Sequence, residues 1–181
     1  AKEFYALYPY SEDASWDYET KTVKTYLTHK QKASAGGFDS SAAISVASES
    51  DGVLRFENVG ALMTFTISSS DVKEIIIKSN NAEKLAGEAT LTVYSDGTVP
   101  SVQMAQDAEL AVSLDCGEGV HLSIDDPMTF YVALPPTSFA KGFTVELENT
   151  EGAVCTLEAS AANVVGRSQI LCMPVATVKF S

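Results

Sequence analysis

The sequence has few basic residues and only two histidines. Its 181 residues include 12 lysines and arginines against 24 aspartates and glutamates, which gives a net charge of −12 and a pI near 4.4. A surface this acidic repels phosphate groups, so the charge argues against nucleic acid and anionic lipid headgroups as partners. An excess of negative charge is also an ordinary means of keeping a protein in solution.

The sequence also lacks a long hydrophobic run. No stretch of about 18 apolar residues occurs, so we predict no transmembrane helix, and no signal peptide or lipidation motif is recognisable. The chain begins at Ala1 rather than at a methionine. We therefore expect a processed product or an excerpt of a longer chain, exported by a signal outside this sequence. Membrane attachment is expected only through an anchor that this sequence does not contain.

None of the common catalytic motifs is present. The sequence contains no HExxH, GxSxG, GxxxxGK or GxGxxG pattern. His29 and His121 lie far apart in sequence, and we expect each to be solvated. A Ser-His-Asp triad assembled only by the fold stays open as an alternative. We predict a protein that is not an enzyme, with no catalytic residues, no cofactor and no metal.

One acidic pair could contribute to a calcium site. Asp125 and Asp126 precede Pro127, but calcium requires six or more oxygen ligands and the EF-hand spacing is missing. We favour a turn that begins with aspartate.

The three cysteines do not form a disulfide framework. Cys116, Cys155 and Cys172 are odd in number, and no CxxC pair occurs. Each lies in or beside an apolar strand pattern, so we favour buried free thiols. One bridge plus one free thiol stays open, because strands distant in sequence can be neighbours in a sandwich.

Hydrophobic residues make up 45% of the chain, and they alternate with polar ones. This period of two predicts strands with one face on a core and the other in water, separated by Gly and Pro turns typical of a sandwich or barrel. The inward sets are Met63, Phe65 and Ile67; Ile75 and Ile77; Leu110, Val112 and Leu114; and Phe143, Val145 and Leu147. The predicted strands are Phe4–Tyr10, Thr20–Leu27, Val53–Phe56, Ala61–Ile67, Val72–Lys78, Gly87–Tyr94, Glu109–Leu114, Thr129–Leu134, Phe143–Glu148, Val154–Leu157, Ile170–Met173 and Val175–Phe180.

The first 50 residues differ in composition from the rest. Lys30–Ser50 is rich in Ala, Ser and Gly and poor in large apolar residues, which indicates a linker, with a helical turn over Ser40–Ala47. We therefore predict a boundary near residue 50. Residues 1–50 would be the remnant of a preceding β domain plus the linker, and residues 51–181 a β-sandwich domain.

The only tryptophan lies in an aromatic and acidic segment. Trp16 is surrounded by carboxylates and has Tyr18 two residues on, with further tyrosines nearby. Core or inter-domain packing is the commoner role of a lone tryptophan. The alternative is a carbohydrate-binding module, in which Trp16 and Tyr18 stack on a sugar ring.

The last segment, Ile170–Phe180, is apolar, prone to form strands and interrupted by Pro174. Its simplest role is to close the sandwich. It also has the features of a strand that leaves its own sheet and completes that of a neighbour. In that case Val175, Val178 and Phe180 are the candidate strand-exchange anchors.

Several stretches share residue type and order with one known family. Phe56, Asn58 and Val59 lead into a hydrophobic strand, Val72 and Lys73 open the next, and Leu85–Gly87 form a turn. Further matches are the aromatic strand Tyr5–Tyr10, the small-residue segment Thr28–Ala47, and Tyr131–Gly152 with its double proline and hairpin. Together they resemble the fimbrillin-like (Mfa-like) surface lipoproteins of anaerobic Gram-negative gut and oral bacteria.

The resemblance implies an all-β fold, an antiparallel, transthyretin-like β-sandwich of Greek-key type. It also implies a non-enzymatic fimbrial or adhesin-type subunit at the cell surface, the outer membrane or the fimbrium. The implied partners are other fimbrial subunits or ligands on host or bacterial surfaces, met through strand edges and exposed loops. In this family some members assemble by strand exchange after trimming at an arginine, and others cap, anchor or decorate the fibre. The resemblance extends over most of the chain: it covers the family's C-terminal domain and, of the first domain, only the end.

Overall fold

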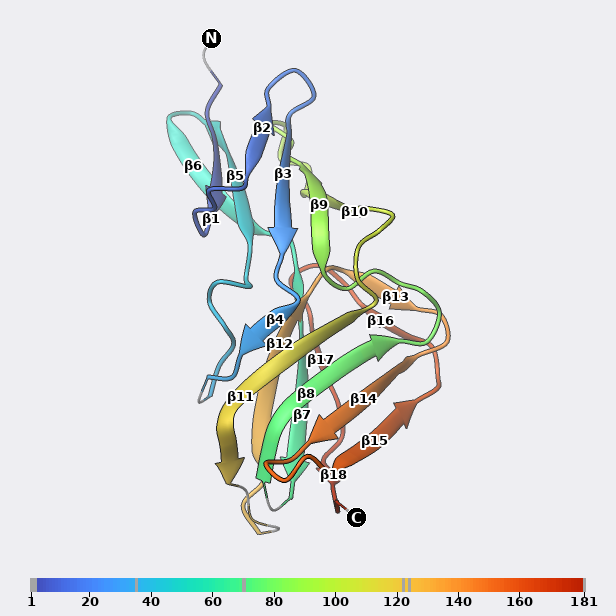
Figure 1. Cartoon of the computed structure of the whole chain (residues 1–181). Coiled ribbons are helices and arrows are strands. Elements are labelled where there is room, and N and C mark those ends of the chain that lie inside the picture. Colours follow the sequence, from blue (N-terminus) through green and yellow to red (C-terminus); the bar gives the residue numbers. More distant parts are fainter. Residues whose placement is uncertain (1–2, 35, 70, 122, 124, 181) are drawn as a thin grey trace.

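The computed structural model describes residues 3–34, 36–69, 71–121, 123 and 125–180, and it contains no helix within them. Two β-sandwiches lie end to end, with β1 near one end of the molecule and β18 near the other (Figure 1). The prediction of an all-β sandwich-like fold is confirmed. The transthyretin-like and Greek-key details stay predictions.

The strands follow one another closely along the chain. They are β1 (Tyr5–Tyr8), β2 (Ser15–Asp17), β3 (Thr22–Leu27), β4 (Lys30–Lys32), β5 (Ser45–Ser50), β6 (Val53–Asn58), β7 (Ala61–Ser68), β8 (Asp71–Ser79), β9 (Gly87–Thr92), β10 (Ser101–Met104), β11 (Ala111–His121), β12 (Met128–Leu134), β13 (Thr137–Phe139), β14 (Phe143–Glu148), β15 (Val154–Ala159), β16 (Asn163–Val165), β17 (Ile170–Cys172) and β18 (Ala176–Thr177).

The larger sandwich sets a five-stranded sheet, in the order β15-β14-β8-β11-β4, against β12-β7-β17, with β18 also pairing with β7. Its core contains Met63, Phe65 and Ile67 from β7, as the alternation predicts. Ile75 and Ile77 face them from β8, and Phe143, Val145 and Leu147 from β14. Leu110 was also expected inside, but it is exposed because β11 begins one residue after it.

The smaller sandwich sets β1-β5-β6 against β10-β9-β3-β2. Its core is thin. The buried apolar residues are Val23, Ile44, Val46, Val59, Ala89, Leu91 and Val93, with Trp16, Tyr5 and Leu7 packed against them. The division of the chain into domains at residue 50 stays a prediction. The two hydrophobic clusters themselves interleave along the chain, since Ala89 and Leu91 pack with Val23.

The segment interpreted as a linker is partly strand. The helical turn expected over Ser40–Ala47 is wrong, because Ser45–Ser50 form β5, which pairs with both β1 and β6. Val46 is buried on this strand, and Ile44 is buried just before it. Small residues on β5 are accommodated by close packing, and the tertiary contacts outweigh their low strand propensity.

Most strand pairs are antiparallel, but some are parallel. Within the described residues β4 runs parallel to β11, and β17 and β18 run parallel to β7. The strand expected over Val175–Phe180 is reduced to Ala176–Thr177. Pro174 cannot donate a backbone hydrogen bond, so it separates β17 from β18.

Gly142 occupies a turn that requires glycine. Its φ of +70° is in the left-handed region. A Cβ on this residue would lie 1.7 Å from the backbone oxygen of Ala159. A side chain therefore cannot be placed here without moving the end of β15.

Gln31 fastens one side of the larger sandwich. This β4 side chain is only 1% exposed. Its Nε2 donates to the backbone oxygen of Ala133 at 2.6 Å, and its Oε1 accepts from the Ala133 N–H at 2.9 Å. The side-chain amide thus pairs with β12 as a neighbouring strand would, and it links the two facing sheets on the β4 side.

Replacing Phe143 by alanine should lower the free energy of unfolding by about 3–5 kcal/mol. Phe143 is fully buried, packs edge-on against Phe65 and lies 5.1 Å from Phe139, centroid to centroid. Phe56→Ala is the matched control, because Phe56 is 51% exposed and its loss should change stability by under about 0.5 kcal/mol. Urea titration followed by circular dichroism measures both. Equal midpoints for the two variants contradict the core assignment.

Gln31→Ala should cost about 2–4 kcal/mol, because it leaves a buried N–H and a buried C=O on β12 without partners. Gln103→Ala removes the same side chain from an exposed position on β10 and should leave stability unchanged. The same denaturation experiment compares them. If both variants unfold at the parent midpoint, the Gln31 contact does not hold the sheets together.

Candidate functional site

The C-terminal segment occupies one margin of the larger sandwich. Backbone hydrogen bonds attach it to β7: the N–H of Met173 donates to the oxygen of Thr64 at 3.0 Å, and the N–H of Val178 donates to the oxygen of Ser68 at 2.8 Å. Only two short stretches, separated by Pro174, pair with β7. This attachment is less continuous than that of β12 on the other side of β7, which pairs over its whole length.

The three candidate anchors have different surroundings. Val178 is 4% exposed and belongs to the core, and Phe180 is partly buried against that core. Val175 is 63% exposed, next to Pro174. In this structure Val178 and Phe180 therefore act within their own fold, while Val175 is available at the surface. Their role in strand exchange stays a prediction.

An apolar groove separates the C-terminal segment from β15. It has a volume of about 200 Å³, its floor is formed by Phe65, Ile67, Phe143 and Val145, and its walls by Leu157 on β15 and Met173–Ala176. On this side the groove lies between the two sheets, whereas Gln31 fastens the other side. β15 is the outer strand of its sheet, and an outer strand offers unpaired backbone groups to a partner.

Trp16 sits between two tyrosines. Its ring centroid lies 5.9 Å from that of Tyr5 and 6.4 Å from that of Tyr18, and the ring planes of Trp16 and Tyr18 are 22° apart. Trp16 is partly buried against the small core, as the packing interpretation expects, while Tyr18 is 68% exposed. Asp17, next to Trp16, accepts hydrogen bonds from the backbone of Glu19 and Thr20. Its carboxylate thus shapes a turn.

Of the two histidines, the structure describes the side chain of His29. His29 Nδ1 lies 3.1 Å from the hydroxyl of Tyr26 and 3.9 Å from a carboxylate oxygen of Glu109, on an exposed surface. Burial, and then the Glu109 carboxylate, raise the pKa of Tyr26. The side chain of His121 lies outside the described part. Asp125 and Asp126 are exposed, and Asp126 pairs with Ser123 in an isolated bridge. Among the described residues no group of three or more potential ligands could hold a metal ion.

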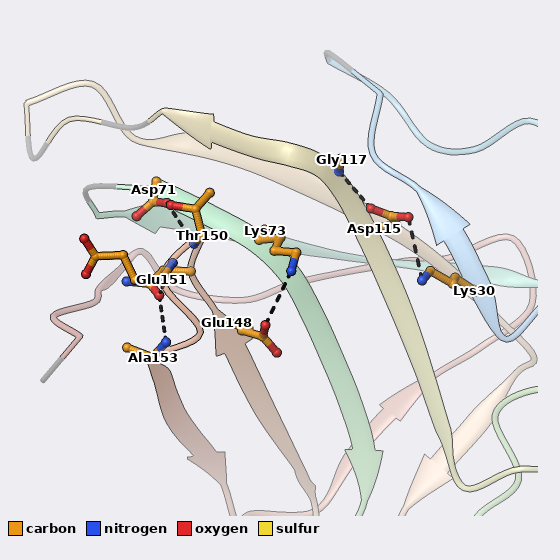
Figure 2. A network of polar contacts seen from close by, with 10 residues as sticks. Lys30, Asp71, Lys73, Asp115, Gly117, Glu148, Thr150, Glu151 and Ala153 are labelled. Carbon is orange, nitrogen blue, oxygen red and sulfur yellow. Dashed lines mark hydrogen bonds and ion pairs between the residues drawn. The ribbon is translucent and has the colours of Figure 1, made fainter.

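A polar network tightens the loops at the far end of the larger sandwich (Figure 2). Asp71 accepts a hydrogen bond from the Thr150 N–H at 3.0 Å and another from its hydroxyl. Lys73 and Glu148 form an ion pair at 3.7 Å across β8 and β14, and Lys30 and Asp115 another at 3.7 Å across β4 and β11. These contacts join neighbouring strands and turns, and we assign them a structural role.

The three thiols are free. Cys116 and Cys155 are partly buried, but Cys172 is exposed, so the expectation of burial is wrong for Cys172. Burial, followed by the nearby carboxylates of Asp115 and Glu74, raises the pKa of Cys116 to about 12. This thiol is therefore protonated and unreactive near neutral pH.

Two solved structures share the fold. A candidate cell adhesion protein from Bacteroides ovatus matches with a TM-score of 0.54 and 14% identity, covering 91% of this chain and 59% of that one. A second candidate cell adhesion protein, from Bacteroides uniformis, matches with a TM-score of 0.51 and 15% identity, covering 97% of this chain and 67% of that one. At this identity the likeness shows the fold, and it agrees with the fimbrillin-like resemblance of the sequence. The chain spans only about three fifths of the first neighbour.

No family model matches the sequence. No curated protein matches it either. Within the described residues there is also no helix of the length and apolar character that crossing a membrane requires.

Thiol labelling at pH 8 should distinguish the cysteines. Cys172 should react first with a disulfide reagent such as DTNB, and Cys116 only when the protein unfolds, because its thiolate is suppressed by the raised pKa. Cys172→Ser should abolish the fast phase, and Cys116→Ser should leave it unchanged. A fast phase that survives Cys172→Ser contradicts the placement of the C-terminal segment.

Proposed function

We propose that the protein is a non-enzymatic, cell-surface subunit of fimbrial or adhesin type, which associates through β-strand edges and exposed loops. The observation that carries the proposal is the asymmetry of the larger sandwich. One side is fastened by Gln31, and the other presents β15, an apolar groove and a discontinuously paired C-terminal segment.

The groove has the chemistry that strand addition uses. A partner strand laid against β15 would satisfy the unpaired backbone groups of an outer strand, and its alternate side chains would fill apolar space beside Phe65 and Leu157. Val154, on the exposed face of the outer strand β15, and Val175, in the wall of the groove, are both exposed. Exposed apolar side chains at a sheet edge promote aggregation of a monomeric protein, so their presence here favours an edge that binds a partner.

Two further observations support a surface role. The two structural neighbours are candidate cell adhesion proteins, and the strong negative charge disfavours nucleic-acid partners. The partners are other subunits of the same structure or ligands on host and bacterial surfaces.

A carbohydrate-binding module centred on Trp16 and Tyr18 is the second candidate. The near-parallel rings and the exposure of Tyr18 favour it, because an exposed aromatic face can stack on a sugar. The burial of Trp16 against Tyr5 and the small core leaves Tyr18 as the accessible member of the pair.

The edge proposal predicts that Val154→Lys and Val175→Lys weaken association without unfolding the protein. A lysine at an exposed edge opposes strand pairing by charge and solvation. Sedimentation velocity over a concentration series, with electron microscopy for fibres, should show oligomers of the parent and a shift toward monomer in each variant. Thermal melting should stay unchanged, because both positions are exposed.

Val99→Lys is the matched control, since Val99 is equally apolar and exposed but lies in the β9–β10 loop of the smaller sandwich. It should associate like the parent. A parent protein that stays monomeric at high concentration, before and after mild trypsin treatment, counts against a self-assembling subunit. Association equally weakened by Val99→Lys counts against these edges.

A further inference from the structure

The smaller sandwich has polar side chains where its strand pattern calls for core. In the β5–β6 hairpin, Val46 lies opposite Glu57, and Ser48 lies opposite Arg55. Because side chains on directly opposed residues share a face, these four residues project to the same side of the sheet. Val46 belongs to the core, so Ser48, Arg55 and Glu57 continue the inward-facing surface as polar groups. Meanwhile Leu54 and Phe56, on the alternate face, are exposed.

A cavity lies beside these inward-facing polar side chains. A pocket of about 290 Å³ lies between the inward face of the hairpin and the connection from β9 to β10. Buried Val46, Val93 and Pro100 contribute apolar surface, and Tyr94 adds an aromatic side chain that is partly exposed. Arg55, Glu57 and Asp96 place charged groups around it. The pocket thus combines apolar surface with a few polar groups, as small-molecule sites do.

The walls of the pocket are held in place. The hydroxyl of Ser48 donates to the backbone oxygen of Tyr94 at 3.0 Å, which ties β5 to the loop across the pocket. Asp96 accepts from the N–H of Thr98 at 2.9 Å, which fixes the loop itself. At the hairpin tip, the Glu49 carboxylate accepts from the N–H of Gly52 at 2.6 Å. A site with walls fixed in advance loses less entropy when it binds.

The Glu57 side chain at the edge of this pocket is oriented by Arg167, which does not line the pocket. Oε2 of Glu57 is buried, and within the described residues it accepts no hydrogen bond. The nearest cation, Nη1 of Arg167, is 3.9 Å away and bonds instead to the backbone oxygen of Asn58 at 3.0 Å. The Glu57 side chain as a whole is 40% exposed, so its carboxylate is also open to a ligand in the pocket.

We infer that this pocket binds a neutral sugar unit of a glycan. Sugars present an apolar face and a set of hydroxyl groups. The apolar face of a sugar can pack against the apolar floor of the pocket and Tyr94. Its hydroxyl groups can form directed hydrogen bonds with the carboxylates of Glu57 and Asp96 and with the Arg55 guanidinium. The two carboxylates outnumber the one guanidinium in a protein of net charge −12, which disfavours an anionic sugar. The inference deepens the proposed surface role and rests on it for the source of the glycan.

Titration of the isotopically labelled Val175→Lys protein with sugars, followed by NMR, tests the site. This variant is used because it is expected to be monomeric. The probes are the methyl glycosides of glucose, galactose, mannose and N-acetylglucosamine, with sialic acid as the anionic comparison, each at millimolar concentration. Binding of a neutral sugar should shift the amide signals of residues 48–57 and 94–98. Adding Arg55→Ala should weaken binding at least about tenfold, as should Asp96→Asn, which retains an acceptor for the N–H of Thr98.

Lys73→Ala is the matched control, since it removes a cation from β8 of the larger sandwich, where Lys73 pairs with Glu148 (Figure 2), and it should bind like the parent. Thermal melting checks that each variant is folded. The inference is overturned if no neutral sugar shifts these signals, if the shifts centre on Trp16 and Tyr18, or if only sialic acid binds. Sedimentation of the edge variants is measured independently, so a failure of the pocket and a failure of the assembly proposal are separate results.

Discussion

The interaction on which the larger sandwich depends is the pair of hydrogen bonds between the Gln31 side chain and the backbone of Ala133. A five-stranded sheet faces a four-stranded one in which β17 and β18 share one side of β7, so the sandwich has one margin at β4 and β12 and another between β15 and the C-terminal segment. Gln31 fastens the margin at β4 and β12, because its side-chain amide forms the two hydrogen bonds to β12 that a neighbouring strand would form. The cost of a buried amide is offset because both of its polar groups are paired.

Closing one margin leaves the other to the C-terminal segment. That segment pairs with β7 in two short parallel stretches and is separated from β15 by an apolar groove. Its contribution to stability comes mainly from Val178 and its partly buried neighbours, because the backbone ladder is interrupted at Pro174. The same features that make this margin weaker than the other also make it able to accept a strand, so the proposed function follows from the way the core is enclosed.

The sequence predicted those parts of the fold in which side chains alternate. Met63, Phe65 and Ile67 are buried as expected, and β14 has the predicted bounds. β5 was missed because Ala and Ser carry little strand signal, and its burial comes from packing against residues that are distant in sequence. Gln31 could not have been identified as buried, since nothing local marks a polar residue that finds its partner 102 positions away. The pocket beside Arg55 was also missed. In the predicted strand at Val53–Phe56, Leu54 and Phe56 alternate with Arg55, but this alternation does not reveal which face of the strand turns toward the core.

Native-state hydrogen exchange tests the central claim most directly, because it measures local opening at each amide. The account predicts that the amides of Met173 and Val178, which bond to β7, open at least about 2 kcal/mol more easily than the protein unfolds. The amide of Ala133, bonded to Gln31, should exchange only through global unfolding. If Met173 and Val178 are protected as strongly as Ala133, the two margins are equally fastened and the account is contradicted.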